Sequence, residues 1–144
     1  MLYLDTGCLV KLYYPEPDSD LVAARVSGET IVYTPVHSLE LATALELKVF
    51  RKEATPEQAS LGFASVQEDV SAGKLIPVEA PILDSLHEAV NFARQHTSTT
   101  GCRALDILHC AWAKKLNVTG FISTDTRQIA LARLVGLQVL AIRG

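Results

Sequence analysis

The sequence predicts an α/β fold in which helices pack on a central parallel sheet. Short runs of apolar, β-branched or aromatic residues recur along the chain, and longer segments with a helical pattern separate them. Regular alternation of strands and helices is typical of a parallel sheet. Only 6% of the 144 residues are aromatic while 49% are apolar, so Leu, Val, Ile and Ala must form the core. We expect one folded domain over residues 1–144.

In the first half of the chain, breaking and capping residues set the limits of each expected element. Pro15 stops the first helix, and Asp18 with the following serine caps the second, which Gly28 ends. Thr55 at the N-cap and Pro56 at the first helical position begin the fourth helix. The expected elements are a strand at 2–4, helices at 8–14 and 19–26, a strand at 30–34, and helices at 35–52 and 56–73.

In the second half, strands and helices continue to alternate, and a polar loop is expected at residues 97–101. Pro77 lies within the third strand and indicates that this strand is at an edge of the sheet, since proline cannot donate a ladder hydrogen bond. The expected elements are a strand at 75–78, helices at 81–96 and 103–116, a strand at 120–123, a helix at 127–135 and a last strand at 138–141.

The composition argues against several classes of protein. No apolar run approaches the roughly 20 residues that span a bilayer, and the N-terminus lacks the basic segment of a signal peptide. The three cysteines, Cys8, Cys102 and Cys110, form no C-x-x-C pair, which argues against a disulfide framework and a zinc ribbon. They indicate reduced thiols, so we expect a cytoplasmic location and no membrane partner. The net charge of −3 is uninformative alone, because a duplex-wrapping protein is usually basic but an enzyme with an acidic site can still contact nucleic acid through a local basic patch.

Four carboxylates fall where strands end or helices begin. Asp5 ends the first strand, and Asp125 follows the fourth strand by two residues. Glu40 lies in the second turn of the helix after the second strand, and Asp106 lies in the first turn of the helix after the polar loop. In an open parallel sheet, the functional crevice lies beyond the carboxyl ends of the strands. We therefore expect these four residues to converge in one acidic site.

An acidic site of this kind requires a compensating cation, because neighbouring carboxylates repel one another and raise each other's pKa. Hard oxygen ligands favour Mg²⁺, or Mn²⁺, over zinc. Such a cation can activate water and stabilise the leaving oxygen of a phosphodiester. Taken singly, each acid also has a structural interpretation, Asp106 as an acid at a helix start and Asp125 as part of a turn.

The segments around the four acids resemble those of a known family. Residues 4–13, LDTGCLVKLY, resemble the opening of PIN-domain proteins, especially VapC-type toxins. Residues 38–42, 103–111 and 121–125 resemble, in this order, the glutamate motif and the third and fourth acidic motifs of that family. One departure is Gly7, at a position where many members carry serine.

The resemblance implies a three-layer α/β/α sandwich with strand order 3-2-1-4-5 and Mg²⁺-dependent endoribonuclease activity. For VapC members it also implies inhibition by a cognate antitoxin, and a homodimer is expected. Within that framework, we expect Asp5, Asp106 and Asp125 to hold the metal, either directly or through water. Glu40 is expected to ligate the metal or to orient the attacking water.

Further polar residues near the acids receive supporting roles. Thr6 and Ser123 are expected to hydrogen-bond the carboxylates and hold their rotamers, and their structural alternative is turn chemistry at the strand ends. Five basic residues are candidates for holding RNA phosphates around the acidic centre. They are Lys11, Lys48, Arg51, Arg103 and Arg127. For any single one of them, the alternative is a solvated charged surface.

Other functions remain open from the residues alone. Asp106 with His109, and His37 with Glu40, have the three-residue spacing of acid and histidine found in di-iron bundles, but the strand–helix alternation disfavours that architecture. His109 is expected instead to pack and to hydrogen-bond near the site. A haloacid-dehalogenase-like phosphatase would need a second aspartate where Gly7 stands. The cysteines have no base-and-orienter arrangement for nucleophilic catalysis. A non-catalytic PIN-like module that binds RNA or protein is the main alternative.

Overall fold

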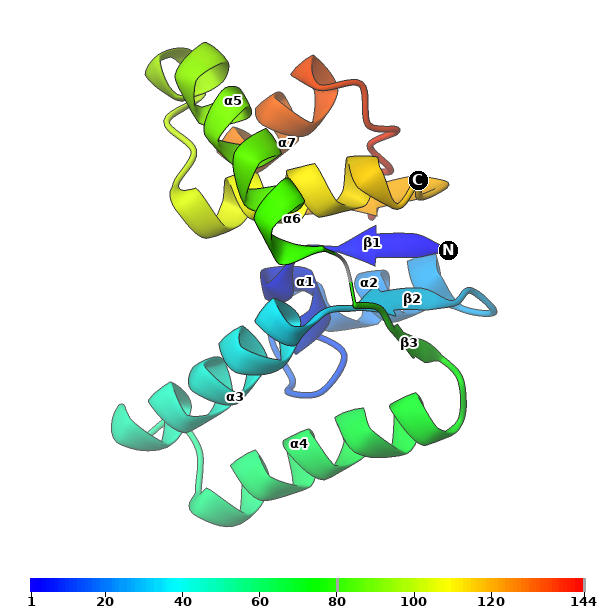
Figure 1. Cartoon of the computed structure of the whole chain (residues 1–144). Helices are drawn as coiled ribbons and strands as arrows, with labels where there is room; N and C mark the ends of the chain where they lie inside the picture. Colours follow the sequence, from blue (N-terminus) through cyan, green and yellow to red (C-terminus); the bar gives the residue numbers. More distant parts are fainter. Residues whose placement is uncertain (80, 144) are drawn as a thin grey trace.

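The computed structural model describes residues 1–79 and 81–143, and Ala80 and Gly144 lie outside this range. Within it, four strands form one sheet with seven helices around it (Figure 1). The strands are β1 (Leu2–Leu4), β2 (Ile31–Tyr33), β3 (Leu75–Pro77) and β4 (Gly120–Ile122). The helices are α1 (Thr6–Val10), α2 (Ser19–Val26), α3 (Pro35–Phe50), α4 (Pro56–Ser71), α5 (Ile82–Thr100), α6 (Ala104–Lys115) and α7 (Thr126–Leu134).

The sheet has the order β3-β2-β1-β4, and every neighbouring pair is parallel. In β1, Leu2 pairs with Ile31 of β2 on one side and with Gly120 of β4 on the other. β3 lies at one end of this order, so the edge position predicted from Pro77 is confirmed. The central position of β1 places its carboxyl end in the middle of the functional edge of the sheet.

The expected fifth strand at residues 138–141 is wrong as a full strand. Val139 forms a single parallel bridge with Phe121. Two backbone hydrogen bonds hold this bridge, from Phe121 N to Gln138 O at 2.8 Å and from Leu140 N to Phe121 O at 2.9 Å. Both bonds go to the middle residue of β4. The segment still lies beside β4, where the predicted order places it.

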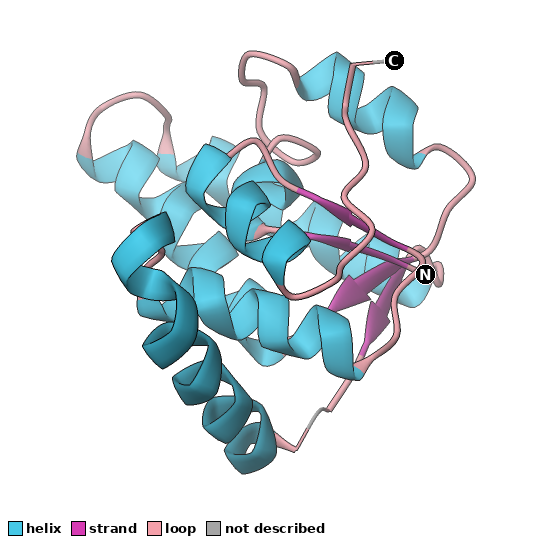
Figure 2. Cartoon of the chain, turned by 90° about the horizontal axis from the view of Figure 1, so that it is seen from above, coloured by secondary structure: helices cyan, strands magenta, loops and turns pink. Residues whose placement is uncertain are grey.

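Successive side chains along each strand point into two cores, one on each face of the sheet. Tyr3 and Phe121 belong to the core formed with α5, α6 and α7. Leu4 and Ile122 belong to the core formed with α1, α2, α3 and α4. The strands therefore lie between two layers of helices (Figure 1), and Figure 2 shows the same sheet and helices from above. This arrangement confirms the predicted three-layer α/β/α sandwich.

Two helices depart clearly from their predicted limits. α1 begins earlier than predicted because Asp5 caps it through its side chain, and it also ends earlier, at Val10. α5 continues through most of the segment predicted as a loop at 97–101. Thr99 and Thr100 both donate their hydroxyls to the carbonyl of His96, so these polar residues are satisfied within the helix. A glycine in the left-handed conformation, with φ of 72°, then ends α5.

The helix caps agree with the prediction at Thr55 and differ at Asp18. Thr55 accepts a hydrogen bond from Gln58 N, and the Gln58 side chain accepts one from Thr55 N. Asp18 occupies the N-cap position of α2 without a side-chain capping bond. Its Oδ1 instead accepts a hydrogen bond from Arg143 Nη2 at 2.7 Å. Across residues 1–79 and 81–143, no helix combines the length and apolar character needed to cross a membrane.

Candidate active site

Asp5 stands at the end of β1 and begins α1. Its Oδ1 accepts a hydrogen bond from the Cys8 backbone N–H at 2.7 Å, and its Oδ2 accepts one from Ser123 Oγ at 2.5 Å. The residue is only 7% exposed. Burial raises the pKa of Asp5, although the hydrogen bonds from Ser123 and Cys8 act in the opposite direction. A cation beside Asp5 would therefore favour its charged form.

Ser123 connects Asp5 to the segments that carry two further acids. Its Oγ accepts a hydrogen bond from the Asp125 backbone N–H at 3.0 Å and lies 2.9 Å from Gln128 Oε1. The single hydroxyl proton of Ser123 therefore goes to Asp5 or to Gln128. Gln128 Nε2 in turn donates to the backbone carbonyl of Asp106 at 3.2 Å.

Gln128 is a residue of this network that the sequence interpretation missed. It is buried, although glutamine is usually exposed. Its position three residues before Leu131 and four before Ala132, both of which are buried, places it on the core-facing side of α7. A polar residue on the apolar face of a helix next to Asp125 was the signal that could have identified it.

Glu40 lies in the second turn of α3 and is held from two other helices. Its Oε1 accepts hydrogen bonds from Thr6 Oγ1 at 2.9 Å and from His109 Nε2 at 2.5 Å. Burial acts to raise the pKa of Glu40, but the hydrogen bond and charge of His109, together with the Thr6 hydroxyl, lower it below its ordinary value. Glu40 is therefore ionised at neutral pH.

Asp106 stands in the first turn of α6 and is half-buried. Burial raises its pKa, and the charges of Asp125, Asp5 and Glu40 raise it further, while His109 acts in the opposite direction. The four acids are thus near enough to influence one another's ionisation. The structure brings Asp5, Glu40, Asp106 and Asp125 to one end of the sheet, where the strand-end rule places them.

Asp125 is exposed and caps α7. Its Oδ1 accepts hydrogen bonds from the backbone N–H groups of Arg127 at 2.8 Å and Gln128 at 3.3 Å. This is the turn role given above as the structural interpretation of Asp125. The cap engages one oxygen, so the same carboxylate retains an oxygen for a ligand.

The donor set of this site fits a hard divalent cation in its chemistry. The groups are carboxylate oxygens, which suit Mg²⁺ or Mn²⁺. Burial disfavours the charged forms of Asp5 and Asp106 unless a cation is present, and repulsion from the neighbouring acids adds to this effect at Asp106. In residues 1–79 and 81–143, however, no three His, Cys, Asp or Glu side chains are arranged as a ready-made coordination group. Side-chain rotation or intervening water is therefore needed for these acids to share a cation.

A family model described as the PIN domain matches residues 2–134. The chain belongs to the PIN domain family. Two solved structures, each 18% identical to it, share the fold. FitAcB from Neisseria gonorrhoeae has a TM-score of 0.64 and covers 99% of this chain and 98% of its own. FitAB bound to the IR36 DNA fragment has a TM-score of 0.68 and covers 99% and 95%, respectively. No curated protein sequence gives a significant match.

The PIN domain fold removes two alternative functions. A di-iron bundle consists of packed helices alone, whereas this chain covers a parallel sheet with helices. His37 is also engaged in the fold, since its Nε2 donates to the carbonyl of Leu4 at 2.8 Å and burial lowers its pKa to about 3. A haloacid-dehalogenase-like phosphatase belongs to a different family, and Gly7 stands where its second aspartate would be needed.

The thiols of this PIN domain are buried and free. Burial raises the pKa of Cys8, Cys102 and Cys110, so all three are protonated at neutral pH. Cys102 Sγ donates to the backbone carbonyl of Arg127 at 3.1 Å. Protonated thiols are poor nucleophiles, which argues against catalysis by cysteine here.

Two of the predicted phosphate-binding residues of the PIN domain, Lys11 and Lys48, share an acid partner. Lys48 Nζ lies 2.7 Å from Glu16 Oε1 and 4.5 Å from the centre of the Tyr14 ring. Lys11 Nζ lies 3.3 Å from Glu16 Oε2 and donates to the carbonyl of Pro17 at 3.0 Å. The two lysine charges are therefore partly balanced within the protein, which reduces their value for binding RNA.

The three predicted arginines differ in their distance from the acids. Arg103 directly precedes α6, and Arg127 lies in the first turn of α7, so each stands at the same helix start as one of the acids. Both are exposed. Arg51 caps the far end of α3, about 16 Å along the helix axis from Glu40. Arg103 and Arg127 are thus the basic residues placed beside the acidic site.

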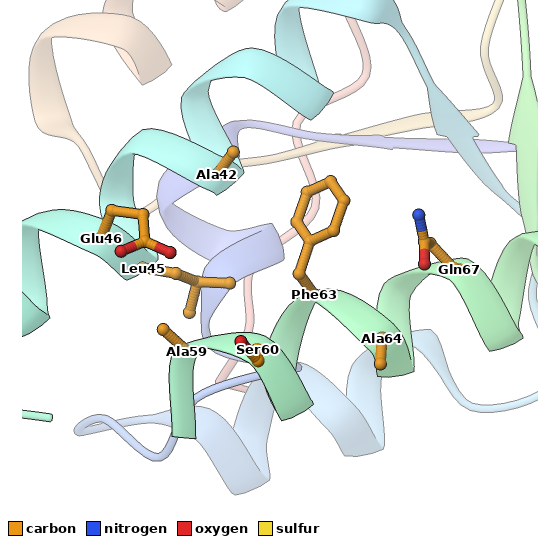
Figure 3. A pocket seen from close by; sticks show the side chains of 8 residues that line it. All are labelled: Ala42, Leu45, Glu46, Ala59, Ser60, Phe63, Ala64 and Gln67. Atoms are coloured by element: carbon orange, nitrogen blue, oxygen red, sulfur yellow. The ribbon is translucent and has the colours of Figure 1, made fainter. Parts of the chain in front are cut away.

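A pocket of about 320 Å³ lies between α3 and α4 of the PIN domain (Figure 3). Leu45 and Phe63 line it together with small residues of both helices and with the polar Glu46 and Gln67, and none of the four acids of the site takes part. The carboxylate of Glu46 makes this lining unsuited to a phosphate. The acidic site and this pocket are therefore separate features of the surface.

Proposed function

We propose that this PIN domain is a metal-dependent endoribonuclease and the toxin of a toxin–antitoxin pair. The observation that carries the proposal is the convergence of four acids at one end of the sheet, near enough to influence one another's ionisation. The Asp5 carboxylate is joined through Ser123 and Gln128 to the backbone carbonyl of Asp106, and Glu40 is fixed separately by Thr6 and His109. A purely structural role does not require four acids at one end of the sheet.

In this proposal, Asp5, Asp106 and Asp125 hold Mg²⁺, or Mn²⁺ in its place. The bound cation supplies Lewis acidity that lowers the pKa of a water molecule and stabilises charge on the phosphate. Glu40 remains ionised and orients the water through the oxygen that Thr6 and His109 leave free, accepting its proton as the water oxygen attacks phosphorus. The P–O bond to the leaving ribose oxygen breaks, and that oxygen takes a proton from solvent. Arg103 and Arg127 hold the flanking phosphates.

Mapping of RNA 5′ ends in cells that express the wild type or Asp5→Asn tests this proposal. We expect new RNA 5′ ends to accumulate with the wild type and to be absent with the variant. Purified protein should cut the same sites with Mg²⁺ or Mn²⁺ and stop when EDTA removes the metal. Equal growth arrest and equal end profiles for the two proteins would overturn the proposal.

The partners are proposed from the VapC-like motifs. A small antitoxin encoded beside this gene binds the chain and stops RNA cleavage, and the free chain is a cytoplasmic homodimer. Light scattering of the purified chain measures its mass directly, and a monomer at micromolar concentration contradicts the dimer. Co-expression with the product of the adjacent reading frame should restore growth, and unchanged growth arrest contradicts the antitoxin.

A non-catalytic PIN domain that binds RNA or protein is the second candidate, and one observation favours it. Among the described residues, no three metal-binding side chains form a ready-made group. Isothermal titration calorimetry with Mn²⁺ separates the two candidates. Binding that disappears in Asp106→Asn supports the nuclease, whereas the absence of binding to the wild type supports the non-catalytic module.

A further inference from the structure

His109 is buried in α6 and joins the core of the protein to Glu40. Its Nδ1 lies 2.7 Å from the hydroxyl of Tyr3 in β1, and its Nε2 lies 2.5 Å from Glu40 Oε1 in α3. Thr6 Oγ1 in α1 lies 3.3 Å from the same Nε2. One imidazole therefore connects four elements of the fold, and it ends on a carboxylate of the candidate active site.

Aromatic neighbours fix the orientation of the His109 ring. The centre of the His37 ring is 4.6 Å away, that of Tyr3 is 5.7 Å away, and that of Trp112 is 6.4 Å away. The side chain of His109 is 2% exposed, whereas that of Glu40 is 26% exposed. A ring enclosed in this way cannot rotate to another partner without disturbing the core.

The direction of the bond between His109 and the acid follows from Glu40. An ionised carboxylate can only accept a hydrogen bond, so Nε2 of His109 carries the proton that it donates to Glu40. Burial raises the pKa of Tyr3, so its hydroxyl keeps its proton and can donate to Nδ1 or accept from it. The hydrogen bonds from Thr6 and His109 both end on Oε1 of Glu40. The other carboxylate oxygen, Oε2, is left for a ligand or a water molecule.

We propose that His109 is a positioning residue of the active site, held in place by Tyr3, and that it fixes Glu40 so that one carboxylate oxygen serves the reaction. This inference rests on the proposed nuclease function. A group that acts through another usually contributes by restricting the geometry of the reacting group rather than by binding substrate. The effect should therefore appear in kcat, with little change in KM.

The simpler role for His109 is to fill the core. Two variants separate the roles. His109→Phe keeps an aromatic ring and loses the hydrogen bond to Glu40. His109→Gln loses the ring and can place an amide N–H near the position of Nε2. Core filling predicts that Phe is the better replacement, whereas positioning of Glu40 predicts that Gln is.

The experiment measures cleavage of a fluorescein-labelled single-stranded RNA of mixed sequence in the presence of Mn²⁺. For His109→Phe we expect kcat to fall about 10- to 100-fold, the usual range for loss of a group that orients a site residue. KM should stay within about twofold, and His109→Gln should recover most of the rate. Tyr3→Phe should show an intermediate loss, and its matched control is Tyr13→Phe, which removes a tyrosine hydroxyl bonded to Asp69 instead.

An NMR measurement tests the contact independently of cleavage. In ¹⁵N-histidine-labelled protein, the Nε2 resonance of His109 should move when Glu40 is replaced by Gln, and the Nδ1 resonance should move in Tyr3→Phe. Wild-type rates in His109→Phe, or a better rescue by Phe than by Gln, overturn the positioning role alone. Failure of the wild type to cut RNA with either metal overturns the proposed function, and this inference with it.

Discussion

Asp5 and Glu40 are both acids of the candidate active site, yet their surroundings move their pKa values in opposite directions. Asp5 receives its hydrogen bonds from a backbone N–H and a hydroxyl, which do not offset its burial. Glu40 receives one from a hydroxyl and one from the imidazole of His109. The protein itself stabilises the charge of Glu40, whereas a cation would be needed to stabilise the charge of Asp5. The Asp5 corner of the site (Asp5 with its donors Ser123 and the Cys8 N–H) and the Glu40 corner (Glu40 with Thr6 and His109) therefore differ in how their charge is stabilised.

The largest effect is expected from Asp5→Asn. Loss of this carboxylate should reduce RNA cleavage by at least about 100-fold, the scale for removing one group that stabilises charge at a reaction centre. The same change should stabilise the fold by about 1 kcal/mol, because an amide avoids the cost of a buried charge. Glu40→Gln is the comparison: it should also impair cleavage, yet destabilise the fold by about 1–3 kcal/mol through loss of a charged hydrogen-bond partner. Thermal unfolding measures both changes, and a lower Tm for Asp5→Asn contradicts the interpretation.

The stability difference between wild type and Asp5→Asn should depend on pH and on metal. The folded pKa of Asp5 is raised, so between its ordinary value and that raised value the native state binds more protons than the unfolded state. Stability of the wild type relative to the variant therefore falls as pH rises through this window. Mn²⁺ at a hundred times its Kd should add about 2.7 kcal/mol to the wild type alone. Urea unfolding at several pH values, with and without Mn²⁺, checks both trends. If the stability advantage of Asp5→Asn over the wild type shrinks as pH rises, the prediction is contradicted.

Removing the hydroxyls that serve the two acids leaves the carboxylates in place, so the expected effect is on stability. Ser123→Ala leaves Asp5 with one hydrogen bond fewer and also frees Gln128 Oε1, so a loss of about 1–3 kcal/mol is expected. Thr6→Val should cost less, because Glu40 retains the bond from His109. Chemical denaturation of the two variants measures the contrast. Equal losses would show that the two corners are held equally tightly.

The parts of the site that follow local rules could be predicted from the sequence. Strand ends and helix starts place Asp5 and Asp125, and the alternation of strands with helices predicts the parallel sheet that brings them together. The contact between Tyr3 and His109 joins residues 106 positions apart. No local spacing rule contains that contact, since it depends on how α6 packs over β1.

Tertiary pairing also explains where the sequence interpretation fell short. The helical spacing of Lys48 and Glu40 along α3 says nothing of Glu16, which comes from a separate turn and binds both Lys48 and Lys11. The segment at 97–101 has a loop-like composition, but its threonines bond within the helix. In each case a side chain makes a hydrogen bond or ion pair that secondary-structure propensity does not predict.

The smallest effect should come from Gly7→Ser, which restores the residue that many PIN domains carry. Gly7 lies in α1, and a Cβ added there would lie 3.6 Å from Asp5 Oδ1, an ordinary van der Waals distance. The side chain therefore fits, and stability should change by no more than about 0.5 kcal/mol. A hydroxyl beside Asp5 adds an oxygen near the acid that lacks charge compensation, so Mn²⁺ affinity should rise by about twofold to fivefold, on the scale of one weak hydrogen bond. Gly7→Ala is the control that adds the Cβ without the hydroxyl. If both variants bind Mn²⁺ as the wild type does, the hydroxyl has no part in the Asp5 corner, and the difference between the two corners lies in the carboxylates and His109 alone.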